Sequence, residues 1–259
     1  MTDKTRKARL TLAALGVLMV GALIGGGVTA AAVLGGDDTE KDAGKAAPTA
    51  SPSPSKSKAL MYPDITPEKG SKVKLIEPTG QKGGASTGFP HTTDGAISAV
   101  VYFWEEYAFL DDQKARQQLE VVTSPDADGY IDEQISEVRK LRESVGLPPS
   151  GGTPAGVTFE TSVNAARVRA LTDPSGSLSR GDVVSVWLNY DRYATQADGA
   201  PDGDPLKDEM TQFIVKWQDG GWKFTDEAKY KDQADFPVSY KSDSAYAWQD
   251  GWWQVRHVD

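Results

Sequence analysis

The chain has 259 residues, of which 39% are apolar, and a formal net charge of -9. Lys4, Arg6, Lys7 and Arg9 against Asp3 give the first nine residues a charge of +3, which leaves -12 for the rest of the chain. An acidic chain gains nothing from counterion release on phosphate backbones, so nucleic-acid binding is disfavoured. The sequence has no cysteine, which excludes disulfides, thiol nucleophiles and thiolate metal sites.

Residues 10–34 form an uncharged, mostly apolar segment that follows the basic tail of residues 1–9. As a helix this segment would be roughly 37 Å long, against a membrane hydrocarbon core of about 30 Å. Asp37, Asp38 and Glu40 follow it, so the positive-inside rule places the N-terminus in the cytoplasm and the C-terminus outside. We therefore expect a single-pass protein of the plasma membrane that contacts the bilayer through residues 10–34.

Two further interpretations of this segment stay open. Ala30 and Ala32 are similar to the cleavage site of a signal peptide, although the segment is longer than the usual apolar region of about 7 to 15 residues. Gly21 and Gly25 form a G-x-x-x-G pair, which is compatible with close approach of two such helices and with a homo-oligomer.

Residues 35–87 are polar and small, with the run PTASPSPSKSK at residues 48–58 and QKGGASTG at residues 81–88. This composition predicts a disordered Ser/Pro/Gly/Lys-rich linker. Within it, residues 72–76 alternate weakly, as in a short edge strand. The folded domain is expected to cover residues 88–259.

The first half of this domain has helical periodicity. Ile97, Val100, Val101, Trp104 and Ala108 recur at helical spacing and predict a helix over residues 94–110, capped by Thr92 or Thr93. A short helix over residues 113–122 and a third helix over residues 130–145 are expected to follow, the third ending before Gly146 and Pro148.

The period changes to two after residue 156. Residues 157–163 and 183–189 alternate as strands do, and Asp219-Gly220 lies between two apolar runs as the turn of a hairpin. The sequence WQDG recurs at residues 248–251, which suggests a second hairpin. Helices followed by antiparallel strands predict an α+β fold in which about three helices pack on a curved, cone-like sheet.

Two acidic segments invite comparison with metal sites. Residues 124–135 contain the D-x-D-G-x-I core of a calcium loop, but Ser124 takes the first ligand position and Ile135 the last, where a bidentate Glu is needed. This favours a turn that starts a helix. Asp198, Asp202, Asp204 and Asp208 lie among Gly and Pro without fixed ligand spacing, which is typical of a hairpin connection.

The residues that could carry catalysis are few. His91 and His257 are the only histidines, so a Ser-His-Asp triad or a two-histidine metal site is disfavoured. Glu105 and Glu106 are adjacent on a helix and point about 100° apart, so they cannot flank one substrate bond. The C-terminal tryptophans suit sheet packing or stacking on wall sugars, with packing favoured: Trp217, Trp222, Trp248, Trp252 and Trp253. The sequence therefore predicts no catalytic, cofactor-binding or metal-binding residue, and no cofactor.

The segment GFPHTTDGAISAVVYFWEEY, residues 88–107, resembles the start of the outer domain in single-span membrane proteins encoded by actinobacterial conjugative elements of the Streptomyces type. The similarity is to a G-[YF]-P-H-T-x-x-G-A block before an apolar helix, and the C-terminal W-x-D-G-x-W also fits. The resemblance implies a nuclear-transport-factor-2-like cone and a part of an assembly. The fold alone does not decide function, because it also hosts isomerases.

The leading hypothesis is a non-enzymatic, membrane-anchored extracytoplasmic scaffold or docking domain of a conjugation or secretion machine, with other envelope proteins as partners. The first alternative is a tethered module that binds cell-wall glycan or a small ligand in the mouth of the cone. The second alternative is an isomerase-like or dehydratase-like enzyme, which needs an acid and a base inside the cone.

Overall fold

The computed structural model describes residues 62–257 except 197, 202 and 234. They form an α+β fold with five α-helices and a curled sheet that is largely antiparallel. The expected tail, span and first part of the linker lie in residues 1–61, outside the described residues. Among the helices that are described, none has the length and apolar character needed to cross a membrane.

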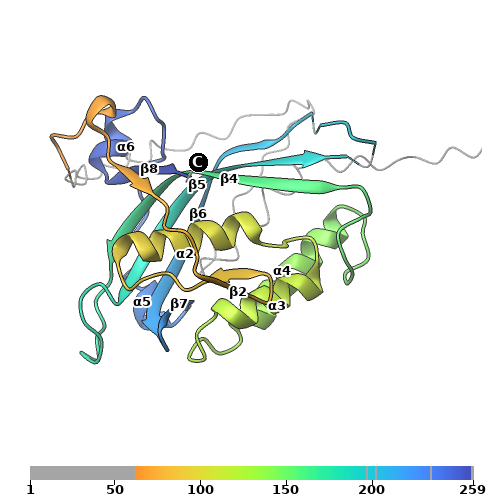
Figure 1. Cartoon of the computed structure of the whole chain (residues 1–259), viewed down its shortest axis with the longest axis horizontal. Helices are drawn as coiled ribbons and strands as arrows, with labels where there is room; N and C mark the ends of the chain where they lie inside the picture. The colour runs from red at the N-terminus through yellow and green to blue at the C-terminus, as the bar shows by residue number, and fades with distance from the viewer. Residues whose placement is uncertain (1–61, 197, 202, 234, 258–259) are drawn as a thin grey trace, which may run out of the picture.

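The main sheet has six strands in the order β1-β8-β4-β5-β6-β7 (Figure 1). Its long strands are β4 (Thr158–Ala170), β5 (Val183–Thr195) and β6 (Leu206–Gln218), and its short strands are β7 (Gly221–Phe224), β8 (Trp252–Arg256) and β1 (Lys72–Lys74). Neighbours run antiparallel except β1, which is parallel to β8. We call the face that packs against helix α2 (Thr93–Glu106) the inner face, and the opposite face the outer face.

Three of the helices confirm the sequence predictions closely. Helices α2, α3 (Asp112–Val122) and α4 (Tyr130–Ser144) correspond to the three expected from helical periodicity. Figure 1 shows them together on one side of the long strands, where their apolar residues join the main hydrophobic core. Two short helices, α5 (Ala228–Lys231) and α6 (Ala245–Gln249), and the 3-10 helix η1 (Pro67–Lys69) were not anticipated.

The start of α2 explains the residue block that carried the family resemblance. Thr92 caps the helix, since its hydroxyl accepts a hydrogen bond from the Gly95 amide at 3.0 Å. A Cβ at Gly95 would lie only 2.0 Å from the carbonyl oxygen of Pro90, so this position requires glycine. That carbonyl also accepts a hydrogen bond from Trp222 Nε1 on β7. The block therefore attaches the helix to the edge of the sheet.

Helix α2 ends at Glu106, four residues before the predicted end. The reason is a tertiary contact: the buried Gln118 side chain accepts from the Ala108 amide and donates to the carbonyl oxygen of Glu106. The Nε2 of Gln118 also donates to the carbonyl oxygen of Gly84. One side chain thereby satisfies main-chain groups that would otherwise continue the helix.

The two copies of WQDG adopt different structures. In the first copy, Asp219 and Gly220 have φ of 52° and 75° and turn β6 into β7, which confirms the predicted hairpin. The second copy is not a hairpin: Trp248 and Gln249 end α6, and Gly251 leads into β8. The predicted second hairpin is wrong because Asp250 is held by tertiary contacts, from Arg167 and from the Val238 amide.

The linker boundary predicted at residue 87 is also wrong. Strand β1 extends the sheet beyond β8, as its weak alternation suggested, and buries Val73. Strands β2 (Gly80–Lys82) and β3 (Ala85–Thr87) form a hairpin with a Gly83-Gly84 turn. Glu106 accepts hydrogen bonds from the amide and hydroxyl of Ser86, which ties this hairpin to α2. A Gly/Ser-rich composition resembled a linker because these short strands bury few apolar residues of their own.

Candidate functional site

Aromatic rings fill the space between α2 and the inner face. Trp104 on α2 packs edge-on against Tyr190 of β5 and Phe213 of β6, at centroid distances of 5.2 and 5.3 Å. Phe103 makes a similar edge contact with Phe224 of β7. These side chains are buried and belong to one hydrophobic cluster. The centre of the fold is therefore a packed core.

One charged side chain, Arg192 of β5, lies within this aromatic layer. It is 1% exposed, and its Cζ lies 3.9 Å from the ring centroid of Phe109 and 4.9 Å from that of Trp104. Its Nε donates a hydrogen bond to the hydroxyl of Thr161 at 2.9 Å. Burial lowers the pKa of the guanidinium to about 10, because a charged group loses its hydration there.

Arg192 forms no ion pair with any carboxylate in the part of the chain that the structure describes. Its Nη2 is buried and has no hydrogen-bond acceptor, and the indole Nε1 of Trp104 is in the same condition. Glu209 lies on the same face, opposite Tyr190, and burial raises its pKa although Arg192 partly opposes the effect. Since buried donors are nearly always paired, two unpaired donors beside one another are unusual.

A cavity of about 490 Å³ adjoins this arginine. Its lining includes Phe109 and Thr161, the two residues that also contact Arg192, together with Phe159 and Val157. Its remaining lining residues come mainly from the end of α2 and the loop before β4: Glu105, Glu106, Tyr107, Ala108, Leu110, Asp111, Lys114, Gly152, Thr153 and Thr158. The cavity is thus apolar near Arg192 and carries acidic residues elsewhere.

Alternation along β5 contains a signal for Arg192 that our sequence analysis missed. Val184, Val186, Leu188 and Tyr190 occupy the inner positions of this strand, and Arg192 continues the same series. A charged residue at the apolar positions of a strand indicates a buried charge. The unpaired state of Arg192 has no signal in the sequence, because it depends on which carboxylates reach it.

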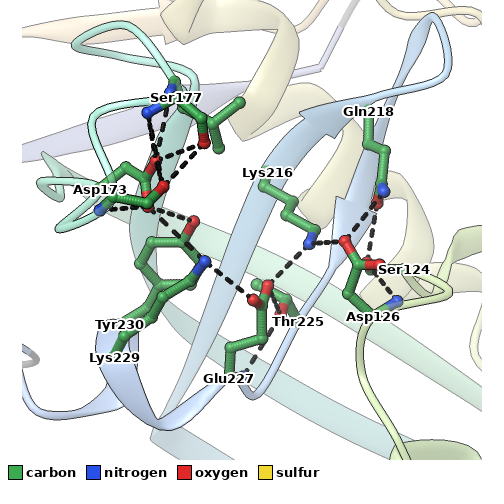
Figure 2. A network of polar contacts seen from close by, with 12 residues as sticks. Ser124, Asp126, Asp173, Ser177, Lys216, Gln218, Thr225, Glu227, Lys229 and Tyr230 are labelled. Carbon is green, nitrogen blue, oxygen red and sulfur yellow. Dashed lines mark hydrogen bonds and ion pairs between the residues drawn. The ribbon is translucent and has the colours of Figure 1, made fainter.

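A second set of charged residues forms a polar network on the outer face (Figure 2). Lys216 of β6 donates hydrogen bonds to Asp126, at 2.6 Å, and to Glu227, at 2.7 Å. Gln218 donates to Asp126 and accepts from Ser124, so the loop before α4 is held to β6. The hydrogen bond from Lys216 holds the pKa of Asp126 below its usual range.

Asp173 lies at the other end of this network (Figure 2). Its carboxylate accepts hydrogen bonds from the hydroxyls of Ser175 and Ser177, which hold its pKa well below the usual range. Tyr230 and Lys229 of α5 approach its other oxygen, at 3.3 and 3.6 Å. Every charged group here has an opposite partner, so the network is a structural clamp across the outer face.

The two acidic segments considered as metal sites form a turn and a strand connection. Residues 124–129 form the expected turn into α4, with Gly129 at a φ of 77° and Asp126 bound to Lys216. Residues 196–205 connect β5 to β6 as expected of a hairpin connection, where the Asp198 side chain accepts from the Ala200 amide. Asp208 lies on β6, and its amide donates to Asp191. Asp202 lies outside the described residues.

The two histidines and the adjacent glutamates lie in separate contacts. His91 stacks on Trp217 at 4.3 Å, and its Nε2 lies 3.0 Å from Asp182. Glu105 accepts a hydrogen bond from the Val163 amide and contacts His257 at 2.9 Å; burial raises its pKa. Glu106 instead binds Ser86, as described above. The structure thus brings Glu105 and His257 together, whereas His91 and Glu106 lie in contacts of their own.

The C-terminal tryptophans mostly serve packing, as predicted. Trp222, Trp248 and Trp252 are buried, and the last two form an outer-face cluster with Tyr240 and Trp187. Trp217 and Trp253 are partly buried against the main core.

Large apolar side chains are exposed next to this outer-face cluster. Four of them lie in or beside the segment that carries α6, and we call them the α6 patch: Tyr62, Phe236, Val238 and Tyr246. Phe236 and Tyr246 are 67% and 66% exposed. The Tyr62 amide donates to Gln249 at the end of α6, and Asp250 holds the Val238 amide. In Figure 1 the first described residues and α6 lie together at one end of the molecule.

No family model, curated protein or solved structure matches this chain.

Proposed function

We propose that the chain is a membrane-tethered, non-enzymatic docking domain, whose α6 patch binds the extracytoplasmic segments of other envelope proteins. The proposal retains the inferred span at residues 10–34, with a cytoplasmic N-terminus and an extracytoplasmic domain. It also assigns the domain a nuclear-transport-factor-2-like cone, with the inner face as the inside of the cone. A conjugation or secretion machine is the assembly that the sequence resemblance favours.

The observation that carries this proposal is the exposure of the α6 patch. Apolar side chains exposed on an otherwise polar surface are typical of binding sites. Aromatic residues such as Phe236 and Tyr246 are also those that contribute most to protein interfaces. Tyr246 is 66% exposed, so most of its ring is accessible to a partner.

The position of the patch also suits a membrane partner. The chain enters the folded domain at Tyr62, next to α6. If residues 35–61 form a flexible spacer, its average end-to-end distance is about 30 Å. The α6 patch would therefore lie close to the outer membrane surface, within reach of the outer segments of neighbouring membrane proteins.

The packed interior favours docking over catalysis. An isomerase-like or dehydratase-like enzyme needs an acid and a base facing an open cavity. Here the inner face is occupied by aromatic rings. The acidic residues that line the adjoining cavity are engaged by other groups: Glu105 by the Val163 amide and His257, Glu106 by Ser86, and Asp111 by the Lys114 amide.

The test is co-purification after crosslinking in cells. The full-length protein is compared with the double variant Phe236→Ser/Tyr246→Ser and with Tyr193→Ser, whose tyrosine is also exposed but lies on β5, outside the patch. We expect wild type and Tyr193→Ser to recover the same membrane proteins, and the double variant to lose them. Recovery of the same partners by all three proteins would contradict the proposal, and recovery of further copies of this chain alone would replace it with self-association.

A further inference from the structure

The buried guanidinium of Arg192 is the feature that the docking function does not use. Burying a charge without a partner is unfavourable by several kcal/mol, and such groups are normally paired with a carboxylate or fully hydrogen-bonded. Arg192 has one hydrogen bond, from Nε to Thr161, and aromatic rings around it. Its Nη2 is buried and lacks an acceptor among the described residues.

A second unpaired donor lies next to it. The ring of Trp104 is 4.9 Å from Arg192 Cζ, and its indole Nε1 is buried without an acceptor. These two unsatisfied donors indicate a place suited to an acceptor with more than one oxygen.

The adjoining cavity gives such an acceptor a route. Phe109 and Thr161 line the cavity and also enclose Arg192. Arg192 and Trp104 do not themselves line the cavity, so a ligand in it reaches the guanidinium only when Phe109 and Thr161 change rotamer. The volume of about 490 Å³ falls within the range of small-molecule sites.

The surroundings select the chemistry of the ligand. A guanidinium donates charge-assisted hydrogen bonds to a planar carboxylate, and Nη2 of Arg192 is a buried donor without an acceptor among the described residues. Phe159, Val157 and Phe109 offer an apolar surface to the rest of the ligand. Glu105, Glu106 and Asp111 outnumber Lys114 among the charged lining residues, so a monoanion is repelled less than an anion of higher charge such as phosphate.

We propose that Arg192 and Trp104 form a binding site for a small organic monocarboxylate, whose carboxylate pairs with Arg192 and whose apolar body occupies the cavity lined by Phe109 and Phe159. This site is separate from the α6 patch and does not depend on the docking function.

The test is NMR of the full-length protein in detergent micelles, labelled with ¹⁵N at the tryptophan indoles. The chain has seven tryptophans, and the variant Trp104→Phe identifies the Trp104 signal. The probe is 3-phenylpropionate, compared with its neutral isostere 3-phenylpropionamide and with inorganic phosphate. We expect the carboxylate alone to shift the Trp104 signal saturably at millimolar concentration.

Two variants link this response to the site. Arg192→Gln should weaken binding by about tenfold or more, since it removes charge-assisted hydrogen bonds, whereas Arg169→Gln, on an exposed arginine of the outer face, should leave binding unchanged. The other indole signals report whether Arg192→Gln folds. If it does not, Val157→Phe tests the site instead, because the larger ring fills the cavity while Arg192 stays in place. The proposal is overturned if no carboxylate shifts the Trp104 signal, if the amide or phosphate shifts it equally, or if Val157→Phe binds as wild type does.

Discussion

The two faces of the main sheet are covered in different ways. On the inner face, helices α2, α3 and α4 supply a continuous apolar layer that belongs to one large cluster. On the outer face, irregular segments and the short helices α5 and α6 cover two small clusters, around Trp252 and around Tyr230. Buried charges occur under this cover, among them Arg167 and Lys216.

The difference follows from main-chain hydrogen bonding. A helix satisfies its own main-chain groups, so it can cover a sheet with apolar side chains alone. An irregular segment cannot, and it needs side chains to bind its amides and carbonyls. Arg167 does this for the Asp250 carbonyl and Asp173 for the Leu178 amide. We therefore expect the helices on the inner face to exchange their amide hydrogens only by global unfolding. The segments that cover the outer face, which we call the outer cover, should open locally.

The largest effect is expected on the inner face, from Phe213→Ala. The Phe213 ring is buried between Trp104, Phe103 and Phe224, and its removal leaves a cavity. The free energy of unfolding should fall by about 3 to 5 kcal/mol. Hydrogen exchange should accelerate together in α2 and in residues 235–250. Phe236→Ala, at an exposed ring, should change stability by less than about 0.5 kcal/mol, and an equal loss in both variants would contradict this account of the inner face.

The next effect is expected on the outer face, from Arg167→Met. Arg167 is buried, and its Nε donates to the Asp250 carbonyl at 2.7 Å while its guanidinium pairs with Asp235. Removal of one partner from a buried pair costs about 3 kcal/mol or more. The amides of residues 235–250 should lose this amount of protection from exchange while those of α2 keep theirs. Arg169→Met is the matched control, because Arg169 pairs with the same Asp235 from an exposed position.

If α2 in Arg167→Met loses as much protection as residues 235–250, the outer cover and the inner layer unfold as one unit. The contrast between the two faces would then be wrong.

The smallest effect is expected from Asp173→Asn, and it depends on pH. Hydrogen bonds from Ser175 and Ser177 hold the pKa of Asp173 below its usual value of about 3.9. The ionised carboxylate therefore stabilises the folded state above that pH, and the stabilisation is lost as the pH falls below it. Chemical denaturation at several pH values should give wild type a larger free energy of unfolding than Asp173→Asn near neutrality. This difference should shrink below about pH 4. A difference that is constant with pH would show that the carboxylate charge does not contribute.

The regular parts of the fold could be predicted from the sequence. The helical stripe from Ile97 to Trp104 and the Asp219-Gly220 turn have local causes, because periodicity and turn chemistry act over a few residues. The predictions that were wrong, the second hairpin and the linker boundary, concern segments whose structure depends on contacts with distant residues. The second WQDG follows α6 because Arg167 and Val238 hold Asp250, and β1 is recognisable as a sheet strand only when β8 lies beside it.

The candidate sites could likewise be predicted only where their causes are local. The alternation of β5 could have identified Arg192 as a buried charge, but its lack of a partner and the cavity beside it emerge only from the packing of α2 and β4. The α6 patch had no sequence signal. Phe236, Val238 and Tyr246 resemble core residues in composition, and their exposure results from the irregular path of the C-terminal segment.

The most direct measurement for the docking account is photo-crosslinking in cells from a single benzoylphenylalanine, placed at position 246 in one full-length variant and at position 193 in another. Tyr246 lies in the α6 patch, and Tyr193 is an exposed tyrosine of β5 outside it. The account predicts crosslinks to other envelope membrane proteins from position 246 and none to them from position 193. Crosslinks to the same proteins from position 193 but not from position 246 would contradict it.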